Sequence, residues 1–587
     1  MVVSVEELFT RALALFRAGR LGDAERCFTE VLQYDPKHIA ALNLLGILLT
    51  HSKKYSEAER ILQSALNINS ISETTFYNYG IVLKALKRPN EALERFNQAL
   101  AINPAVAETW NNRGTVFNDL KRYDDAISDF NKAVALNPNY SEAFYNKGKS
   151  CSRLGRNDEA LTAYEKTLAL NPDLAEAWAG LGDVLLQLKR PDESLAAYER
   201  ALTINPDSAE AWVGRGNAHR QFKQYNEAFV AYDKALALKP DWAEAWLVRG
   251  SLFFSLNRDA EALECYEKSL ALNQDFARAQ WNKALLKLSL GEYEEGWRLF
   301  EWRSKTKDFT LPARHFTQPL WRNDSDISGK TILIHAEYGL GDTIQFSRYL
   351  NFLKDKECKI IFEVQKPLAP LFRSSDWQCE VVAQGELIPS FDLHCPLTTL
   401  PLAFDTRVQT IPANVPYIHA HKGKQVEWIR RIGAASKTRI GLAWSGNPHH
   451  RSDASRSIPL SAFAAIVNDN FEWYRLQKDL READKQALNT LSGIKDFSKL
   501  FEDFSDTAAL IEAMHLVISI DTAIAHLAGA MAKPLWILLP FHPDFRWLRE
   551  RTDSPWYPTA RLYRQTKEDD WTDVLEQVSA DLQKVAS

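Results

Sequence analysis

The feature that most constrains this chain is a 34-residue periodicity that runs through its first half. Proline recurs in one frame, and a glycine follows ten residues after it. The prolines are Pro36, Pro104, Pro138, Pro172, Pro206 and Pro240, and the glycines are Gly46, Gly80, Gly114, Gly148, Gly182, Gly216 and Gly250. A fixed period of this length predicts one pair of helices per unit, each stacked on the next.

Such a pair needs small residues where its helices cross and bulky ones beside them. The small series is Ala24, Ala58, Ala92, Ala126, Ala160, Ser194, Ala228 and Ala262, and the bulky series, four positions before the glycines, is Trp110, Phe144, Trp178, Trp212 and Trp246. Proline ends the second helix of each unit. The pattern closely resembles the tetratricopeptide repeat, with eight units over 5–276 and a degenerate ninth over 277–310.

The resemblance implies a right-handed superhelix with a concave groove for a protein or peptide partner. Asn78, Asn112 and Asn146 stand two residues before a glycine, where the first helix of each unit lines that groove. A carboxamide can both donate to and accept from an extended peptide backbone. This series is similar to the array of eukaryotic O-GlcNAc transferase, although Gly180, Gly214 and Val248 interrupt it. Ordinary solvated polar residues remain the alternative.

Composition narrows the possible partners and surroundings of the chain. The 587 residues carry 76 acidic and 71 basic side chains, which argues against a polybasic nucleic-acid binder. No apolar run reaches about 18 residues, so we expect no membrane span. The start MVVSVEELFT does not read as a leader, and the six dispersed cysteines form no CxxC pair, so a cytoplasmic protein without a zinc site or a disulfide scaffold is expected.

Beyond residue 330 the pattern changes to β-rich runs alternating with helical ones. Residues 311–329 read as a linker, which Trp321 could pin to a domain. Expected strands are 331–335, 359–364, 379–384, 439–444, 472–477, 516–520 and 534–539, and expected helices include 343–355, 460–469, 507–515 and 522–532. This alternation predicts two doubly wound α/β lobes, 330–425 and 426–587, whose ligands bind outside the carboxyl ends of the strands.

Three loops that follow expected strands could carry chemistry. The first contains Gly339, Gly341 and Asp342, where the aspartate could simply cap a helix. The second begins at Ser445 and contains Arg451 and Arg456, which could hold an anion. Its His449–His450 pair lacks suitably spaced partners, so no metal is expected.

The third loop is the turn Asp521-Thr522-Ala523, with His526 one helical turn further on. Thr522 and the first helix amides suit a phosphate, whereas an aspartate cap beside a packed histidine is the simpler alternative. Gln477 or Lys478, at the end of an expected strand, is a weaker candidate for contacting a ribose.

The segments GLGDTIQFSRY, SGNPHHRSDASRSIPL and IDTAIAHLAGAMAKPLW resemble glycosyltransferase family 9, which includes the lipopolysaccharide heptosyltransferases. The resemblance covers about residues 328–585, and the whole architecture is similar to bacterial proteins that join tetratricopeptide repeats to such a domain. It implies a multidomain chain, an all-α superhelix (1–310) followed by a two-lobe α/β GT-B fold. It also implies metal-independent, inverting transfer from a nucleotide sugar, with the acceptor on the first lobe and the donor on the second.

The same resemblance implies roles for single residues. Asp342 matches the base that removes the acceptor proton, and Arg456 matches the basic residue that binds phosphate. Asp521, Thr522 and His526 match the donor phrase, although Ala523 replaces its usual glycine. That departure favours an alternative, a catalytically inactive scaffold that only binds nucleotide sugar or partners. A nucleotide-sugar hydrolase or epimerase on a similar fold is a third reading, and the acceptor could be a polypeptide or a glycan.

Overall fold

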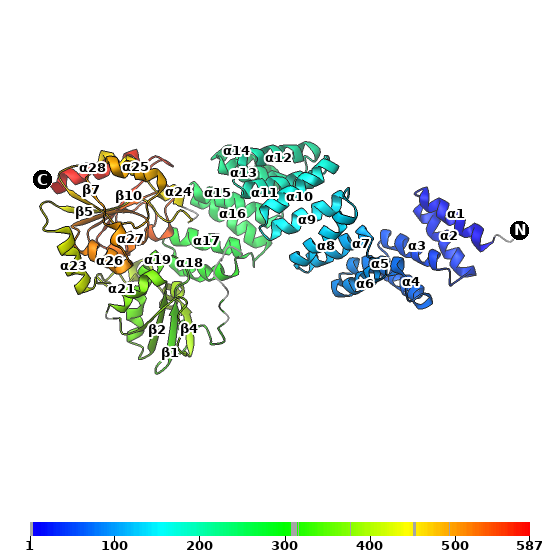
Figure 1. Cartoon of the computed structure of the whole chain (residues 1–587), viewed down its shortest axis with the longest axis horizontal. Helices are drawn as coiled ribbons and strands as arrows, with labels where there is room; N and C mark the ends of the chain where they lie inside the picture. Colours follow the sequence, from blue (N-terminus) through cyan, green and yellow to red (C-terminus); the bar gives the residue numbers. More distant parts are fainter. Residues whose placement is uncertain are drawn as a thin grey trace. The chain divides into compact units, whose positions relative to one another are not determined.

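The computed structural model describes residues 4–306, 314, 316–375, 377–449, 453–491 and 493–586. The chain divides into two compact units, residues 1–245 and 246–587. Paired helices fill the first unit and begin the second (Figure 1). The pairs are α1 (Val5–Arg17) and α2 (Leu21–Tyr34), α3 (Ile39–His51) and α4 (Tyr55–Ile68), α5 (Glu73–Ala85) and α6 (Pro89–Ile102), α7 (Ala107–Asp119) and α8 (Tyr123–Leu136), α9 (Ser141–Arg153) and α10 (Asn157–Leu170), α11 (Ala175–Gln187) and α12 (Pro191–Ile204), α13 (Ala209–Gln221) and α14 (Tyr225–Leu238), α15 (Ala243–Ser255) and α16 (Asp259–Leu272), and α17 (Ala277–Ser289) and α18 (Tyr293–Phe300).

The periodic glycines lie where the two helices of a pair touch. A β-carbon on Gly80 would lie 2.7 Å from Cε1 of Phe96, and one on Gly114 would lie 2.7 Å from Cε1 of Phe130. Those distances are shorter than ordinary contacts of a β-carbon, so a larger residue there would force the facing ring to shift. Tyr164, Tyr198, Tyr232 and Tyr266 face Gly148, Gly182, Gly216 and Gly250 in the same way.

The bulk beside these glycines therefore comes from the second helix, not from the tryptophans four positions before them. Three of those tryptophans instead tie down the preceding turn: the indole Nε1 of Trp110, Trp178 and Trp212 donates to the carbonyl of Pro104, Pro172 and Pro206. Sequence spacing placed both residue types in the right frame but could not say which one a helix presents to its partner.

The α/β part contains two all-parallel sheets. The first has the order β3-β2-β1-β4, with β1 (Thr331–His335), β2 (Lys359–Val364), β3 (Glu380–Ala383) and β4 (Leu393–Pro396). The second has the order β10-β9-β8-β5-β6-β7, with β5 (Arg439–Ala443), β6 (Glu472–Arg475), β7 (Ile494–Lys495), β8 (Leu516–Ile520), β9 (Leu535–Leu539) and β10 (Ala560–Arg564).

Helices lie between these strands, and one more follows the last of them. They are α19 (Leu340–Phe346), α20 (Leu350–Lys354), α21 (Ala369–Arg373), α22 (Leu400–Ala403), α23 (Lys422–Ile432), α24 (Asp453–Arg456), α25 (Glu482–Thr490), α26 (Phe504–Glu512), α27 (Ala523–Ala530) and α28 (Thr572–Ala586). The α-helix expected over 460–469 is instead a 3₁₀ helix, η6 (Leu460–Ala465). Strands β4, β7 and β10 and the helix α28 were not anticipated from the sequence.

The segment expected to be a linker is partly structured. Among its described residues, Trp321 is fully buried in the hydrophobic core, and its backbone N–H donates to the carbonyl of His394 at 2.8 Å. The adjacent Leu320 forms a bridge beside β4. This end of the segment therefore packs on the first sheet.

One hydrophobic core joins the last helical pair to both sheets. It includes Trp297 of α18, Phe346 of α19 and Phe545, which lies in η8 (Phe545–Trp547) after β9. The Trp297 ring lies 6.0 Å from that of Phe346 and 5.8 Å from that of Phe545. The repeated helices end near residue 300, whereas the compact units divide at 245, and the last helical pair shares this core. In the described part of the chain, no helix combines the length and apolarity that a membrane crossing requires.

Candidate functional site

Strand order singles out one crevice in each sheet. In the first sheet, the chain runs outward through β2 and β3 on one side of β1 and returns to β4 on the other. In the second sheet, the same reversal separates β5 from β8. Loops diverge at such points, which makes them the usual ligand sites of open α/β sheets. The loops leaving β1, β5 and β8 are the three singled out in the sequence.

The first loop brings Gly339, Gly341 and Asp342 to the start of α19. Gly339 is the N-cap, and its backbone N–H donates to Oδ2 of Asp342 at 2.9 Å. The capping alternative is therefore realised. The other oxygen, Oδ1, accepts from Nη2 of Arg546, which follows β9 of the second sheet. Asp342 thus caps its helix and faces the second sheet at the same time.

The third loop places Asp521 and Thr522 between β8 and α27, with Thr522 as the N-cap. The Thr522 hydroxyl lies 3.2 Å from that of Ser519. Arg456 of α24, on the loop after β5, donates from Nη1 to the carbonyl oxygen of Asp521 at 2.9 Å. Arg456 and the 521–522 turn therefore meet at the crevice between β5 and β8.

His526 lies where the two sheets approach one another. A β-carbon on Gly341 would lie 2.7 Å from His526 Cδ2, so the loop after β1 touches α27 directly. Nδ1 of His526 lies 3.0 Å from the hydroxyl of Tyr557, and the His526 ring stacks on Trp547. Burial, together with Arg546, holds the pKa of His526 well below its ordinary value. These contacts are those of a histidine packed between the two sheets, as the simpler alternative predicts.

Ser445 and Gln477 bond to each other. The Gln477 carboxamide donates to Ser445 Oγ at 2.6 Å and to the carbonyl of Asp479 at 3.1 Å. Its oxygen accepts from the backbone N–H groups of Trp444 and Ser445. Gln477 is buried, so its amide holds the ends of β5 and β6 together and is not directed at a ribose. The predicted anion contact at Arg451 lies outside the described residues.

Sequence reasoning missed Arg546 and Asp544, which lie beyond β9. Nη1 of Arg546 donates to Asp544 at 2.6 Å, and its Nε donates to Oε1 of Gln345 at 2.7 Å. Arg546 thus links the second sheet to α19 through Gln345 and Asp342. The strand over 534–539 was expected from the sequence. An arginine soon after an expected strand was therefore the signal that could have identified Arg546.

Burial and charge shift the pKa values of two groups at this junction, Asp521 and Arg546. Burial, reinforced by the neighbouring Asp544 carboxylate, raises the pKa of Asp521 to about 6. Burial alone would lower the pKa of Arg546, but Asp544 and Asp342 outweigh it and raise that pKa above its ordinary value. A permanent cation therefore lies among three carboxylates at the junction of the sheets.

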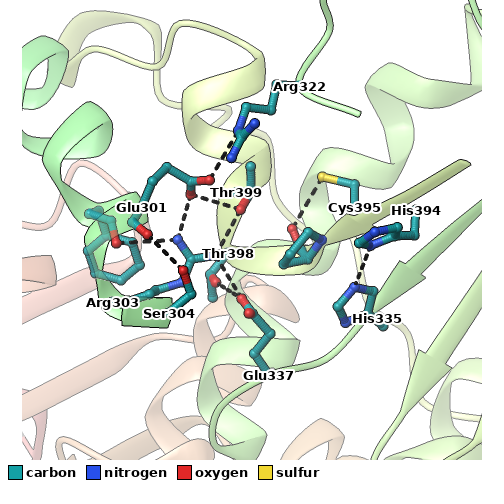
Figure 2. A network of polar contacts seen from close by, with 12 residues as sticks. Glu301, Arg303, Ser304, Arg322, His335, Glu337, His394, Cys395, Thr398 and Thr399 are labelled. Atoms are coloured by element: carbon teal, nitrogen blue, oxygen red, sulfur yellow. Dashed lines mark hydrogen bonds and ion pairs between the residues drawn. The ribbon is translucent and has the colours of Figure 1, made fainter. Parts of the chain in front are cut away.

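The corresponding crevice of the first sheet is filled by protein. Arg303, in the 3₁₀ helix η1 (Glu301–Lys305) after α18, reaches into it and is only 3% exposed. Its Nη2 donates to Glu337 and to Thr399, both at 2.8 Å (Figure 2). These two partners follow β1 and β4. The end of the helical repeats therefore occupies the place where a ligand of this sheet would be expected.

The three asparagines lie on the first helices of successive repeats, where their carboxamides bond to the preceding repeat. Nδ2 of Asn78 donates to Asn43 at 3.4 Å, that of Asn112 to the Tyr77 hydroxyl at 3.0 Å, and that of Asn146 to Asn111 at 3.0 Å. Asn78 is buried. These amides stabilise the stacking of repeats. A peptide could therefore bond only to the donors and acceptors of these side chains that are not already used.

Comparison with known proteins identifies the helical part. Tetratricopeptide repeat models match residues 15–70, 107–140, 145–209, 209–241 and 243–276, so this part of the chain is a tetratricopeptide array. Protein FlbA of Caulobacter vibrioides is 23% identical over an alignment of 333 residues that covers 52% of this chain and 55% of that protein. The chain thus spans about half the length of this curated relative.

Three solved structures are similar to parts of the chain. The tetratricopeptide protein YrrB, described as having an unusual peptide-binding site, is 24% identical, with 31% of this chain and 95% of that one covered and a TM-score of 0.28. MamA is 26% identical, with 27% and 94% covered and a TM-score of 0.26. The Cut9–Hcn1 hetero-tetramer of the APC/C is 21% identical, with 46% and 54% covered and a TM-score of 0.37.

Proposed function

We propose that the α/β part is an inverting, metal-independent glycosyltransferase of the GT-B type that moves a sugar from a nucleotide sugar to a hydroxyl acceptor. The observation that carries this proposal is the junction of the two sheets. There Asp342, a carboxylate at the carboxyl end of one sheet, faces Arg546 and the Arg456–Asp521 contact at the carboxyl end of the other. Sugar transfer to a hydroxyl requires a base that accepts the hydroxyl proton, opposite cationic groups that stabilise the leaving diphosphate.

The proposed reaction forms one carbon–oxygen bond and breaks another. The acceptor hydroxyl attacks the anomeric carbon while Asp342 takes its proton, a contribution of roughly 10²–10⁴-fold. The bond to the nucleoside diphosphate breaks, and its electron pair leaves with the diphosphate. Arg456, Arg546 and the first amides of α27 stabilise the negative charge that develops there.

The ion pair between Asp342 and Arg546 has a consequence for this reaction. While the pair is intact, the Arg546 guanidinium occupies Oδ1 of the carboxylate. An arriving diphosphate offers Arg546 a second anionic partner, and transferring the guanidinium to it frees Asp342. Donor binding would then prepare the base, which suits an ordered reaction in which the nucleotide sugar binds first.

The acceptor we propose is a polypeptide held by the repeat array, by analogy with O-GlcNAc transferase, which joins the same two architectures. The analogy concerns fold and not site chemistry. Mass spectrometry of proteins that copurify with the full-length chain tests it. A hexose or heptose on serine or threonine supports the polypeptide, whereas sugar found only on a glycan contradicts it.

One observation favours a second function, a scaffold with an inactive nucleotide-sugar site. Several polar groups at the junction already pair within the protein: Arg546 pairs with Asp342, Arg456 bonds to Asp521, and His526 contacts Tyr557. Ala523 also adds a methyl group where the related phrase has glycine.

Release of nucleoside diphosphate from a panel of nucleotide sugars distinguishes the two functions. A transferase releases diphosphate faster when a peptide or glycan acceptor is added. A scaffold binds one of the nucleotide sugars without releasing diphosphate under any of these conditions. That second result would contradict the enzyme proposal.

A further inference from the structure

We propose that the last two helical pairs, α15 to α18 with η1, are positioning elements of the candidate site and hold two of the loops that form it. The functional part of this inference rests on the function proposed above. The contacts themselves do not depend on that function. They come from two separate places in the repeats and reach two separate loops of the α/β part.

The first contact holds the loop that leads into Asp342. Arg303 of η1 donates from Nη2 to Glu337, which lies between β1 and the N-cap of α19. Glu337 also accepts from the hydroxyl of Thr398, and Glu301 accepts from that of Thr399. Arg303 and Glu337 are both buried (Figure 2). A buried ion pair whose carboxylate oxygen Oε2 accepts from both Arg303 and Thr398 holds the backbone between β1 and Asp342 in place.

The second contact holds the loop that carries Asp544 and Arg546. Asn257, in the turn between α15 and α16, donates from Nδ2 to the carbonyl of Phe541 at 2.8 Å. Its Oδ1 lies 2.9 Å from Nδ1 of His542 and accepts from Nη1 of Arg549 at 2.5 Å. Arg549 also donates to Asp259, the first residue of α16, at 3.1 Å. Residues 541–549 are thus bonded to the repeats at both ends, with Arg546 between them.

The sequence of this turn departs from that of the other repeats. A left-handed residue follows the first helix of each pair. In the first seven pairs it is lysine or glycine: Gly19, Lys53, Lys87, Lys121, Gly155, Lys189 and Lys223. In the eighth pair the left-handed residue is Asn257, with φ of 57°. Asparagine tolerates this conformation. It also has a short amide that donates and accepts close to the backbone, which lysine cannot do.

The aromatic core connects the two contacts. Trp297 of α18 lies against Phe346 on one side and Phe545 on the other, and these residues follow Asp342 and precede Arg546 in sequence. Tyr293 of the same helix accepts from the indole Nε1 of Trp556 at 3.2 Å. A shift of α18 would therefore change the spacing between Asp342 and Arg546. Small displacements of this kind can cost about 10²-fold in rate.

The test compares two glycine substitutions at equivalent turn positions in the full-length chain. Asn257→Gly keeps the left-handed turn and removes the amide, and Lys189→Gly makes the matched change two repeats earlier. We expect backbone amides of 541–549 to exchange hydrogen at least about tenfold faster in Asn257→Gly and to be unchanged in Lys189→Gly. Asn257→Asp keeps the acceptor for Arg549 and should restore most of the protection.

Turnover measured on the same variants separates this inference from the proposed function. We expect kcat of Asn257→Gly to fall about 10- to 100-fold, with a smaller change in KM. Unchanged exchange in 541–549, or faster exchange with unchanged kcat, would overturn the inference. Faster exchange in a protein whose wild type transfers no sugar would support the contacts and reject the enzyme.

If Asn257→Gly lowers the melting temperature of the whole chain, the variant Arg549→Lys tests the proposal instead. Hydrogen exchange of 541–549 and kcat are measured on it in the same way. Lysine keeps the charge but cannot reach Asn257 and Asp259 together, because it lacks the planar fork of arginine. Local loosening of 541–549 in that variant supports the proposal, and unchanged exchange there contradicts it.

Discussion

At the scale of single residues, the α/β part combines its buried charges into clusters that span separate elements. Arg546 gathers Asp342 and Asp544, and Arg456 reaches the backbone of Asp521. Removing one partner of such a buried pair is costly because the other charge is left unpaired. The effect of each substitution on ligand binding can therefore be separated from its effect on stability only with a control.

Arg456→Ala should weaken the binding of a nucleoside diphosphate by about 10- to 100-fold, since a charge-assisted hydrogen bond contributes about 1.5–3 kcal/mol. Isothermal titration calorimetry measures the change. Arg430→Ala is the matched control, because Arg430 is an exposed arginine on α23 of the same compact unit. Equal affinity in the two variants would remove Arg456 from the donor site.

Asp521 predicts a particular dependence of stability on pH. Its pKa is about 6 in the folded chain and about 3.9 when unfolded, so between those values the folded state binds more protons. Stability contributed by Asp521 is therefore present below about pH 4 and is lost as the pH rises through 6. Asp521→Asn should gain about 1–3 kcal/mol over wild type between pH 4 and 7, measured by urea denaturation. An identical pH dependence in both proteins would contradict this assignment.

At the scale of elements, the sequence predicted more of the repeats than of the α/β part. Periodic glycines and prolines fix helix pairs wherever they occur, because each repeat contacts mainly its neighbours. The order of the strands in a sheet depends instead on contacts distant in sequence. Loops 335–342, 445–456 and 521–526 were found, since each follows an apolar strand. Arg546, Asn257 and Arg303 were not, because their importance comes from partners that sequence spacing does not reveal.

The contact between the helices of a pair gives a direct prediction. Gly114→Ala would place a methyl group 2.7 Å from Phe130 Cε1 and should destabilise the array by about 1–3 kcal/mol. Gly22→Ala is the control, since a β-carbon there meets nothing within 4 Å. Thermal denaturation followed by far-ultraviolet circular dichroism should show a lower midpoint for Gly114→Ala alone. Equal midpoints would show that the crossing tolerates the methyl group.

At the scale of the whole molecule, the end of the helical repeats does not coincide with the division of the chain into two compact units. The helical repeats continue to residue 300, but the second compact unit begins at 246. The last two helical pairs thus belong structurally with the sheets, and they contact the loops on which Asp342 and Arg546 lie. An array that ends inside the second unit gives the repeats a physical connection to the proposed chemistry.

The central claim is that Asp342 is a base facing a bound nucleotide sugar, and Asp342→Ala tests it most directly. Diphosphate affinity and sugar transfer are measured on the same full-length preparation, with the nucleotide sugar that the wild type turns over. The account predicts that transfer falls by at least about 10²-fold while diphosphate affinity stays within a few-fold of wild type. Parallel loss of both, or transfer at the wild-type rate, would contradict it.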